Sequence, residues 1–255
     1  AKDAAKLGAK IYVNTKVISA KKDDGLWCVE TKDQKTGKRE VFLSKVLINA
    51  GGPWVSDIIH NVLRVNTPEK VRLVRGSHIV VPKIWDHGKC YFFQGNDGRI
   101  IFAIPYETDF TLIGTTDIDH IELDEKPKCN ELEKNYLINF ANQYFDTELK
   151  VEDIVWTYSG VRPLQDTSEG NATAVTRDYS IKVNWENAVP LINIFGGKIT
   201  TYRKLSESVL NEVAAFFPKM RGPWTSKAYL PGGDFPVNGV SDLIMDLLKD
   251  YPFLT

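Results

Sequence analysis

Apolar positions change their spacing several times along the chain, and these changes predict where strands and helices lie. In Trp27–Thr31 apolar and polar side chains alternate, which indicates a half-buried strand. Val46–Ile48 is apolar at every position, as in strands that are buried on both faces of a parallel sheet. A glycine turn then leads into apolar positions at helical spacing, namely Trp54, Ile58, Ile59, Val62 and Leu63. This strand–glycine–helix order is typical of nucleotide-binding sheets.

The middle of the chain carries short strand-like runs, each bounded by Gly, Pro, Asn or Asp. They are Val71–Val81, Cys90–Phe93, Arg99–Ile104 and Phe110–Gly114, with further runs at 154–160 and 177–183. Such runs with short turns predict an antiparallel sheet, a second architecture within the chain. Asn130 and Glu133 have the spacing of a capping box at the start of a helix.

A second strand–glycine–helix unit begins at the apolar run Leu191–Phe195 and turns at Gly196–Thr201. Sequence from residue 221 onward is rich in Pro and Gly, which indicates a connection into another helix. At the other end, a helix that closes near Gly8 is followed by a predicted strand, Ile11–Val13. A chain that starts inside a helix and without Met is expected to be a fragment of a longer protein.

Composition excludes several classes of protein. The chain has 255 residues, of which 43% are hydrophobic and 25% charged, unlike a disordered tail, a fibre or a disulfide-rich mini-protein. Its 32 basic and 33 acidic residues give a net charge of -1, which argues against a dedicated nucleic-acid binder. Three widely separated cysteines indicate reduced thiols and no structural zinc site. No apolar run reaches the roughly 18 residues that span a bilayer.

The turn at Gly196–Thr201 is the first candidate for chemistry. A P-loop would need Gly and Ser or Thr where Ile192 and Ile199 stand, so that motif is excluded. A glycine turn at a helix N-terminus can still hold an anionic oxygen, and Lys198 adds a donor. The alternative is a plain connection between a strand and a helix.

Two arginines and a histidine are further candidates. Arg162 and Arg177 flank a polar loop and would form a clamp for phosphate or carboxylate if they converged. From these residues alone, ordinary surface ion pairs are the favoured interpretation. His78 has the side chain of a general base, although a lone histidine on a strand is more often structural. The serine-hydrolase, zinc-protease and Gly-x-Gly-x-x-Gly motifs are absent, so a dinucleotide-binding loop would have to precede residue 1.

Six stretches in the same order resemble the FAD-dependent glycerol-3-phosphate dehydrogenases, the aerobic, quinone-linked members of the D-amino-acid-oxidase-like flavoproteins. They are Ile48–Trp54, Arg75–Pro82, Ile113–Asp117, Tyr158–Leu164, Thr176–Tyr179 and Phe195–Lys204. The resemblance covers about residues 1–220. Gly51 departs from it, because the family usually has Ala there.

The resemblance implies a role for each candidate residue. FAD would be held by Val17, Ala50, Gly51, Trp54, Gly196, Gly197, Lys198 and Thr200. The substrate would be bound by Arg162, Arg177 and Lys198. His78 and Arg162 would be catalytic: Arg162 would orient the C2 oxygen, and His78 would accept the hydroxyl proton. No metal is expected.

The implied activity is oxidation of sn-glycerol 3-phosphate to dihydroxyacetone phosphate, with hydride transfer to FAD and electrons passing to quinone. The full-length protein would be cytoplasmic and peripheral on the inner membrane of a bacterium, through parts outside these residues, and a homodimer is compatible with the resemblance. Nucleic acid is not an expected partner. The 255-residue chain alone is expected to bind FAD weakly or not at all and to turn nothing over.

The expected fold class is α/β and α+β, with an incomplete FAD-binding Rossmann-like domain and an antiparallel-sheet substrate domain with flanking helices. Residues 1–72 would begin the FAD-binding domain, 73–160 form the substrate-binding domain, 161–220 return to the FAD-binding domain, and 221–255 start a C-terminal helical domain. Two alternatives stay open. One is a related flavin-dependent amine or amino-acid oxidase, which would not need a second cation such as Lys198. The other is a non-catalytic module that binds an anion or a partner.

Overall fold

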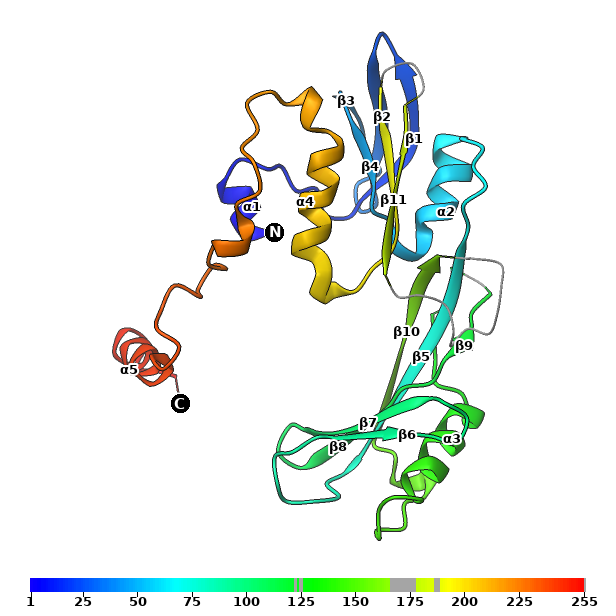
Figure 1. The fold of residues 1–255 in the computed structure, drawn as a ribbon, viewed down its shortest axis with the longest axis vertical. Coiled ribbons are helices and arrows are strands. Elements are labelled where there is room, and N and C mark those ends of the chain that lie inside the picture. Colours follow the sequence, from blue (N-terminus) through cyan, green and yellow to red (C-terminus); the bar gives the residue numbers. More distant parts are fainter. Residues whose placement is uncertain (122, 124–125, 166–177, 186–188, 255) are drawn as a thin grey trace.

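The chain folds into two lobes that are joined by two long paired strands. The computed structural model describes residues 1–121, 123, 126–165, 178–185 and 189–254. The strands β5 (Val71–Pro82) and β10 (Trp156–Gln165) run from the upper lobe into the lower one (Figure 1). They pair antiparallel along their whole length, from Trp156 opposite Val80 to Gln165 opposite Val71.

The upper lobe contains two sheets. An antiparallel meander is formed by β1 (Thr15–Asp23), β2 (Leu26–Asp33) and β3 (Arg39–Ser44). A second sheet has the order β11–β12–β4, with β4 (Leu47–Asn49), β11 (Tyr179–Asn184) and β12 (Leu191–Gly196). The two apolar strands β4 and β12 lie side by side and parallel, and β11 pairs antiparallel with β12. The helices of this lobe are α1 (Lys2–Lys6), α2 (Val55–Asp57) and α4 (Tyr202–Glu212).

Three details of this lobe differ from the sequence predictions. The helix after β4 starts as a 3₁₀ turn, and after α2 it continues as a π-helical segment, Ile58–Leu63. Trp54 ends the tighter 3₁₀ turn and is 49% exposed, so it does not share the buried face. Ile48 is 43% exposed because the described chain covers only one face of β4. Ile11–Val13 forms no strand, since no described strand pairs with it.

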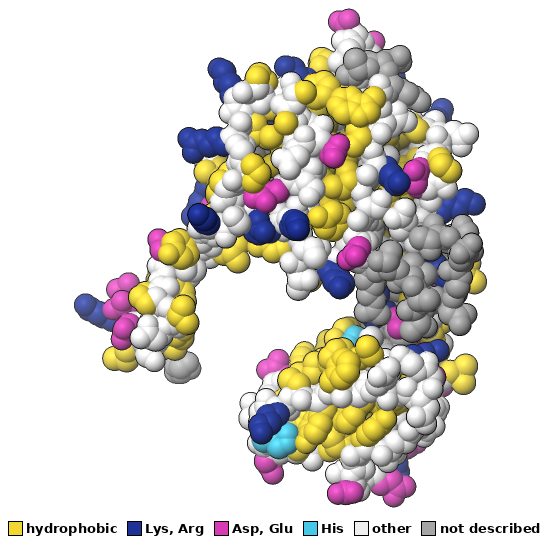
Figure 2. Space-filling model, viewed as in Figure 1, with side chains coloured by type: hydrophobic (Ala, Val, Ile, Leu, Met, Phe, Trp, Pro, Cys, Tyr) yellow, Lys and Arg dark blue, Asp and Glu magenta, His cyan; other side chains and the backbone are white. Residues whose placement is uncertain are grey.

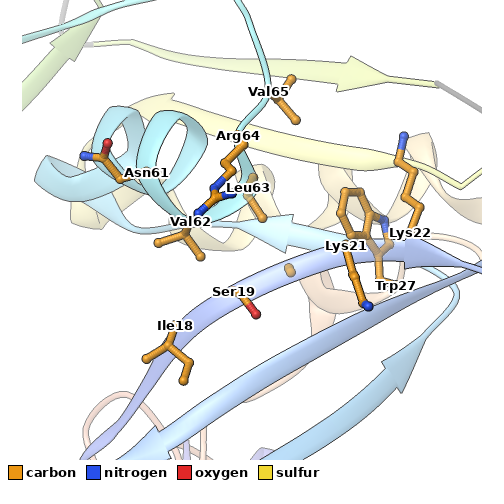
Figure 3. Close-up of a pocket in the computed structure, with 11 residues that line it drawn as sticks. Ile18, Ser19, Lys21, Lys22, Trp27, Asn61, Val62, Leu63, Arg64 and Val65 are labelled. Atoms are coloured by element: carbon orange, nitrogen blue, oxygen red, sulfur yellow. The ribbon is translucent and has the colours of Figure 1, made fainter.

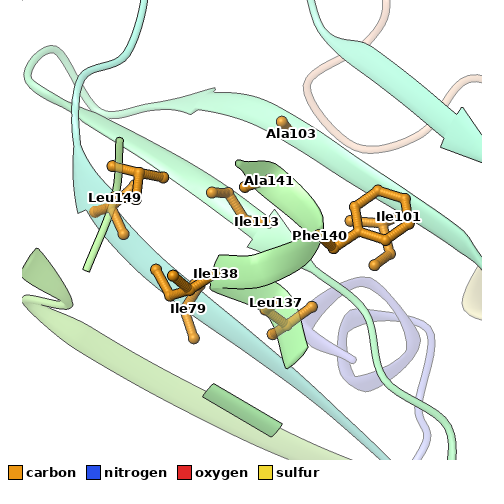
Figure 4. Packing of buried hydrophobic residues seen from close by; sticks show 10 residues of the cluster. Ile79, Ile101, Ala103, Ile113, Leu137, Ile138, Phe140, Ala141 and Leu149 are labelled. Carbon is orange, nitrogen blue, oxygen red and sulfur yellow. The ribbon is translucent and has the colours of Figure 1, made fainter. Parts of the chain in front are cut away.

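The lower lobe is built on the antiparallel sheet that the sequence predicts. Its strand order is β10–β5–β8–β7–β6, with β9 paired to β5, and its further strands are β6 (Tyr91–Gln94), β7 (Ile100–Tyr106), β8 (Phe110–Gly114) and β9 (Ile118–Asp119). Helix α3 (Glu131–Ala141) covers one face. Side chains of the sheet and the helix interlock there, including Ile79, Ile113 and Leu137, all at most 1% exposed (Figure 4).

The start of α3 confirms the predicted capping box. The Asn130 side chain accepts a hydrogen bond from the Glu133 backbone N–H at 2.9 Å, and the Glu133 carboxylate accepts one from the Asn130 N–H at 3.1 Å. At the other end of the chain, α5 (Val240–Asp250) has no buried residue and lies apart from both lobes (Figure 1). Within the described residues, no helix combines the length and apolarity that a membrane span requires.

Candidate active site

His78 lies on the open face of the lower-lobe sheet, opposite the face that α3 covers. Across the strands it is in register with Tyr158 of β10 and with Gly114 of β8, and the same row continues to Phe102 of β7. Successive side chains of a strand point to opposite faces, so Ile79 belongs to the α3 core while His78 does not. Hydrophobic side chains gather over β6–β8 in the space-filling view (Figure 2), and Phe102 is 41% exposed.

The surroundings of His78 keep its imidazole uncharged. The ring stacks on Tyr158 with 4.8 Å between the centroids and 5° between the planes. A Cβ on Gly114 would lie 2.2 Å from His78 Cδ2, so only glycine leaves room for the ring. The Nδ1 atom is buried and has no hydrogen-bond partner among the described residues. Burial first, and the nearby charge of Arg162 second, lower the pKa of His78 to about 4. The ring is therefore neutral near pH 7 and can accept a proton.

Arg162 is fixed by the loop that follows β8. Its Nη1 donates to Asp117 Oδ1 at 2.8 Å and to the Thr116 carbonyl at 3.3 Å, and its Nη2 donates to Thr115 Oγ1 at 2.8 Å. The guanidinium also lies against the backbone of β5, because a Cβ on Gly76 would be 2.2 Å from Nη2. Arg162 is thus a cation with a defined place, and it belongs to the electrostatic surroundings of His78.

Three of the predicted cofactor residues line one cavity in the upper lobe. Val17 of β1 and Gly51 and Trp54 of the turn after β4 face a cavity of about 580 Å³. Its other lining residues are Lys16, Asp57, Ile58, Val62 and Leu123. Ala50 lies in the same turn and is exposed. The structure therefore brings these residues together from separate parts of the sequence.

A buried asparagine pair connects the strand before this turn to the strand before the second glycine turn. Asn49 and Asn193 face each other in the register of β4 and β12. Asn49 Nδ2 donates to Asn193 Oδ1 and to the Val55 carbonyl, both at 3.0 Å, and Asn49 Oδ1 accepts from the Gly51 N–H at 3.2 Å. Its side chain thereby spans the turn and fixes its shape.

The second glycine turn lies next to the segment that carries Arg162. Gly196 and Gly197 have φ values of +68° and +95°, which favour glycine. A Cβ on Gly196 would lie 2.6 Å from the Asp178 carbonyl and 3.6 Å from that of Pro163. After this turn Lys198 caps a short 3₁₀ turn that leads into α4, and Gly197, Lys198 and Thr200 are exposed.

The candidate residues do not all meet. Strand β10 packs against the Gly52–Trp54 turn and against β12, so both glycine turns adjoin the strand of Arg162. The hydrogen bonds and the ring contact given above for Arg162 and His78 involve Thr115, Thr116, Asp117 and Tyr158, and none of them involves Lys198. Arg177 lies outside the described residues.

A second cavity lies farther along β1 and contains none of the predicted site residues. It measures about 470 Å³ and is lined by β1, Trp27 and the end of the π-helical segment (Figure 3). Trp27 is only 2% exposed, and its Nε1 donates to the Pro190 carbonyl at 2.9 Å. The indole is therefore a core group that joins β2 to the segment before β12.

Sequence reasoning gave no role to several residues that shape the site. Tyr158 and Asp117 lie within the stretches that resemble the family, but neither was expected to contact His78 or Arg162. Gly76 makes room for the Arg162 side chain, and Gly114 makes room for that of His78. A signal was present, because a glycine inside a strand often marks the close approach of another group.

Similarity to known proteins identifies the family of this chain. Residues 1–184 match the protein family described as FAD dependent oxidoreductase. The chain belongs to this family. The membership confirms the resemblance and the expected mixed fold class of the FAD-dependent oxidoreductases.

Curated relatives within this family include two bacterial dehydrogenases. The chain is 44% identical over 252 residues to D-erythritol 1-phosphate dehydrogenase of Brucella abortus (strain 2308), covering 98% of this chain and 50% of that protein. It is 41% identical over 249 residues to aerobic glycerol-3-phosphate dehydrogenase of Escherichia coli (strain K12), covering 97% and 50%. The chain thus spans about half the length of the curated relatives it matches.

A solved structure has the same arrangement of elements. The glycerol-3-phosphate dehydrogenase from Bacillus halodurans, complexed with FAD, superimposes with a TM-score of 0.82 at 28% identity, covering 98% of this chain and 48% of that one. The residues of this chain fit a bound FAD. The cavity at Val17 and Trp54 combines apolar side chains with the charged Lys16 and Asp57. The two glycine turns lie where parallel strands end, the usual place for nucleotides in α/β sheets.

Proposed function

We propose that the full-length protein carrying this chain oxidises a polyol phosphate, with sn-glycerol 3-phosphate as the first candidate and dihydroxyacetone phosphate as its product. The observation that carries this proposal is a neutral His78 beside a fixed Arg162 on the open sheet face. The 41% identity to the E. coli glycerol-3-phosphate dehydrogenase supports the choice of substrate. FAD, when bound, supplies the acceptor for the hydride.

In this proposal two groups of residues hold FAD. Val17, Ala50, Gly51 and Trp54 form the first group, supported by the cavity that three of them line. Gly196, Gly197, Lys198 and Thr200 form the second group at the start of the helical segment that contains α4. Exposed backbone N–H groups and a lysine at that position favour an anionic ring edge, which a reduced flavin would present.

His78 and Arg162 would act on the C2 hydroxyl of the substrate. Arg162, held by Asp117 and Thr115, would donate a hydrogen bond to the C2 oxygen and fix its position. His78 would take the hydroxyl proton at Nε2, because Nδ1 is enclosed by protein. Removal of the hydroxyl proton would make the C2 oxygen more electron-rich, and this would favour departure of the hydride from C2.

Binding of the phosphate group is assigned to Arg177 and Lys198. An arginine fork and a lysine would together match a dianionic phosphate, and an amino-acid substrate would need only one cation. The exposed position of Lys198 supports its access to a ligand.

The proposal also includes the electron acceptor, the location of the protein and the division of the chain into domains. We assign quinone as the acceptor and the membrane surface as the location, since a dehydrogenase needs a separate electron acceptor. We also keep residues 1–72 and 161–220 as the FAD-binding domain, 73–160 as the substrate-binding domain, and 221–255 as the start of a helical domain. The continuous pairing of β5 with β10 supports a substrate domain that begins and ends near the site.

D-erythritol 1-phosphate is the second candidate substrate. The 44% identity to the Brucella abortus D-erythritol 1-phosphate dehydrogenase favours it. Both substrates are phosphorylated polyols with a secondary hydroxyl, so the same His78 and Arg162 chemistry applies to either. The choice between them depends on the room around the carbon chain.

Anaerobic flavin bleaching tests the proposal directly. The purified full-length protein is mixed with each polyol phosphate, and flavin absorbance is followed at about 450 nm, where oxidised flavins absorb. We expect bleaching by glycerol 3-phosphate or D-erythritol 1-phosphate, and none by glycerol or amino acids. Bleaching by an amine or amino acid alone would move the protein to the oxidase alternative. A protein that takes up no FAD would leave the non-catalytic alternative.

The same substitution, arginine to lysine, at two positions provides a test variant and a control for this assay. Arg162→Lys keeps the charge but loses the fork that contacts Asp117 and Thr115, and we expect the bleaching rate to fall about 100-fold or more. Arg99→Lys is the control, because Arg99 is not part of the site and forms an ion pair with Asp97 at 3.6 Å. This variant should keep the bleaching rate within about twofold of the wild-type rate. Equal rates in the two variants would contradict the role of Arg162.

A further inference from the structure

Glu133 is a buried carboxylate behind the candidate active site. Its side chain is 1% exposed. Ser77 Oγ and Thr116 Oγ1 each donate to Oε1 at 2.7 Å, while Arg75 Nη2 at 3.0 Å and the Asn130 N–H at 3.1 Å donate to Oε2. A helix cap needs only the bond from Asn130. The other three bonds reach residues outside α3, so Glu133 does more than start the helix.

The charge of Glu133 is stabilised where it lies. Burial raises the pKa of Glu133. The hydrogen bonds from Asn130, Ser77 and Thr116 and the charge of Arg75 lower this pKa by more than burial raises it, so the net shift is downward. Cys129 also faces this carboxylate, and its thiol pKa is raised, first by burial and then by the Glu133 charge. Lys134 on the same helix pairs with Glu131 instead. Glu133 is thus an anion, and Arg75 is its ion-pair partner.

Two chains of contacts lead from Glu133 to the opposite face of the sheet. Thr116 Oγ1, which donates to Glu133, also accepts from the Ser77 N–H at 2.9 Å, and the Thr116 carbonyl accepts from Arg162. Ser77 directly precedes His78, and its Oγ lies 2.7 Å from the Oγ of Ser159. Ser159 in turn directly follows Tyr158, on whose ring His78 stacks.

We propose that Glu133 is a positioning residue that holds Thr116 and Ser77 so that Arg162 and His78 keep their places on the other face of the sheet. The importance of this for catalysis rests on the proposed function. The placement itself does not, because it is a matter of contacts within the chain. Loosening the Thr116 loop would let Arg162 move away from His78 and let water reach the imidazole.

Two variants and one control test this role in the full-length protein. Glu133→Gln removes the charge, and because an amide has one acceptor and one donor end, it cannot accept from both pairs of donors. Thr116→Val removes the link to the loop and leaves the α3 cap intact. Glu131→Gln makes the same charge change two residues earlier in α3, at an exposed position where the carboxylate pairs with Lys134.

The first readout is the titration of His78, followed by NMR with ¹³C-labelled histidine and assigned with His78→Gln. We expect the pKa of His78 to rise by about one unit or more in Glu133→Gln and Thr116→Val, because the ring gains water and loses the neighbouring cation. The control should titrate as the wild type does. An unchanged titration in both test variants would overturn the proposal, and if Glu133→Gln does not fold, Thr116→Val decides alone.

The second readout separates positioning from substrate binding. With glycerol 3-phosphate, we expect kcat to fall about 10-fold in both test variants while KM stays within about twofold, since the phosphate contacts are elsewhere. A rise in KM alone would contradict positioning of the reacting groups. If the wild-type protein oxidises neither polyol phosphate, the proposed function fails, but the histidine titration still decides the placement role.

Discussion

Gly114 determines where the His78 ring can lie, and this gives a direct test of the site. A methyl group there would come within 2.2 Å of His78 Cδ2, so Gly114→Ala must displace the imidazole. We expect kcat to fall about 10-fold or more, because misplacing a catalytic group by about an ångström is this costly. Gly88→Ala is the matched control, since nothing lies within 4 Å of a Cβ there. Steady-state kinetics that show equal rates for the two variants would place His78 outside the chemistry.

The low pKa of His78 also predicts how stability depends on pH. The folded-state pKa of about 4 lies below the ordinary histidine value of 6.5, so between these values the unfolded chain binds more protons at this group. The contribution is fully present above about pH 6.5 and is lost as pH falls toward about 4, to an extent of at most about 3 kcal/mol.

Thermal unfolding of the wild type and of His78→Gln at pH 7 and pH 5 measures this effect. The wild type should lose more stability than the variant on going to pH 5, because glutamine does not titrate. Parallel losses would mean that His78 is hydrated in the folded protein.

Among the strands, β4 and β12 are connected by side chains as well as by backbone. Asn49→Ala would leave the Val55 carbonyl and the Gly51 N–H without their partner, which we expect to cost about 2–3 kcal/mol. FAD affinity should also fall about tenfold, since the turn that contributes Gly51 and Trp54 to the cavity loses its brace. Asn193→Ala removes the single bond that Asn193 accepts from Asn49 and should cost less. Melting temperatures and FAD titrations compare the two, and an equal effect would contradict the bracing role.

These elements also show how far the sequence alone could lead. Local signals were sufficient for the capping box at Asn130, for the lower-lobe strands and for the two apolar strands β4 and β12, although not for their pairing with each other. The strand predicted at Ile11–Val13 failed because a strand needs a partner, and no local pattern shows whether one is present. The contacts of Arg162 with Asp117 and of Ser77 with Glu133 join residues far apart in sequence. Spacing along the chain carries no information about such contacts. The resemblance identified the segments that contain Ser77, Asp117 and Arg162, but not the one that contains Glu133.

The two lobes have separate hydrophobic cores, and the paired strands β5 and β10 run between them (Figure 1). The lower core packs α3 on the sheet, with Leu137 fully buried. In the upper lobe, Leu191 packs with Trp27 and Leu63. No described residue belongs to both clusters. The candidate site lies where β10 meets both glycine turns, so its geometry depends on the stability of both lobes.

Independent cores predict two unfolding transitions in calorimetry. Leu137→Ala and Leu191→Ala each leave a cavity in one core, and each should destabilise its own lobe by about 2–5 kcal/mol. We expect each variant to lower the temperature of a different transition, and FAD to raise mainly the one that Leu191→Ala lowers, because the cavity that Val17 and Trp54 line lies in that lobe. A single transition shifted equally by both variants would show that β5 and β10 couple the lobes into one cooperative unit. In that case a change in either core would reach His78 and Arg162 through the strands that carry them.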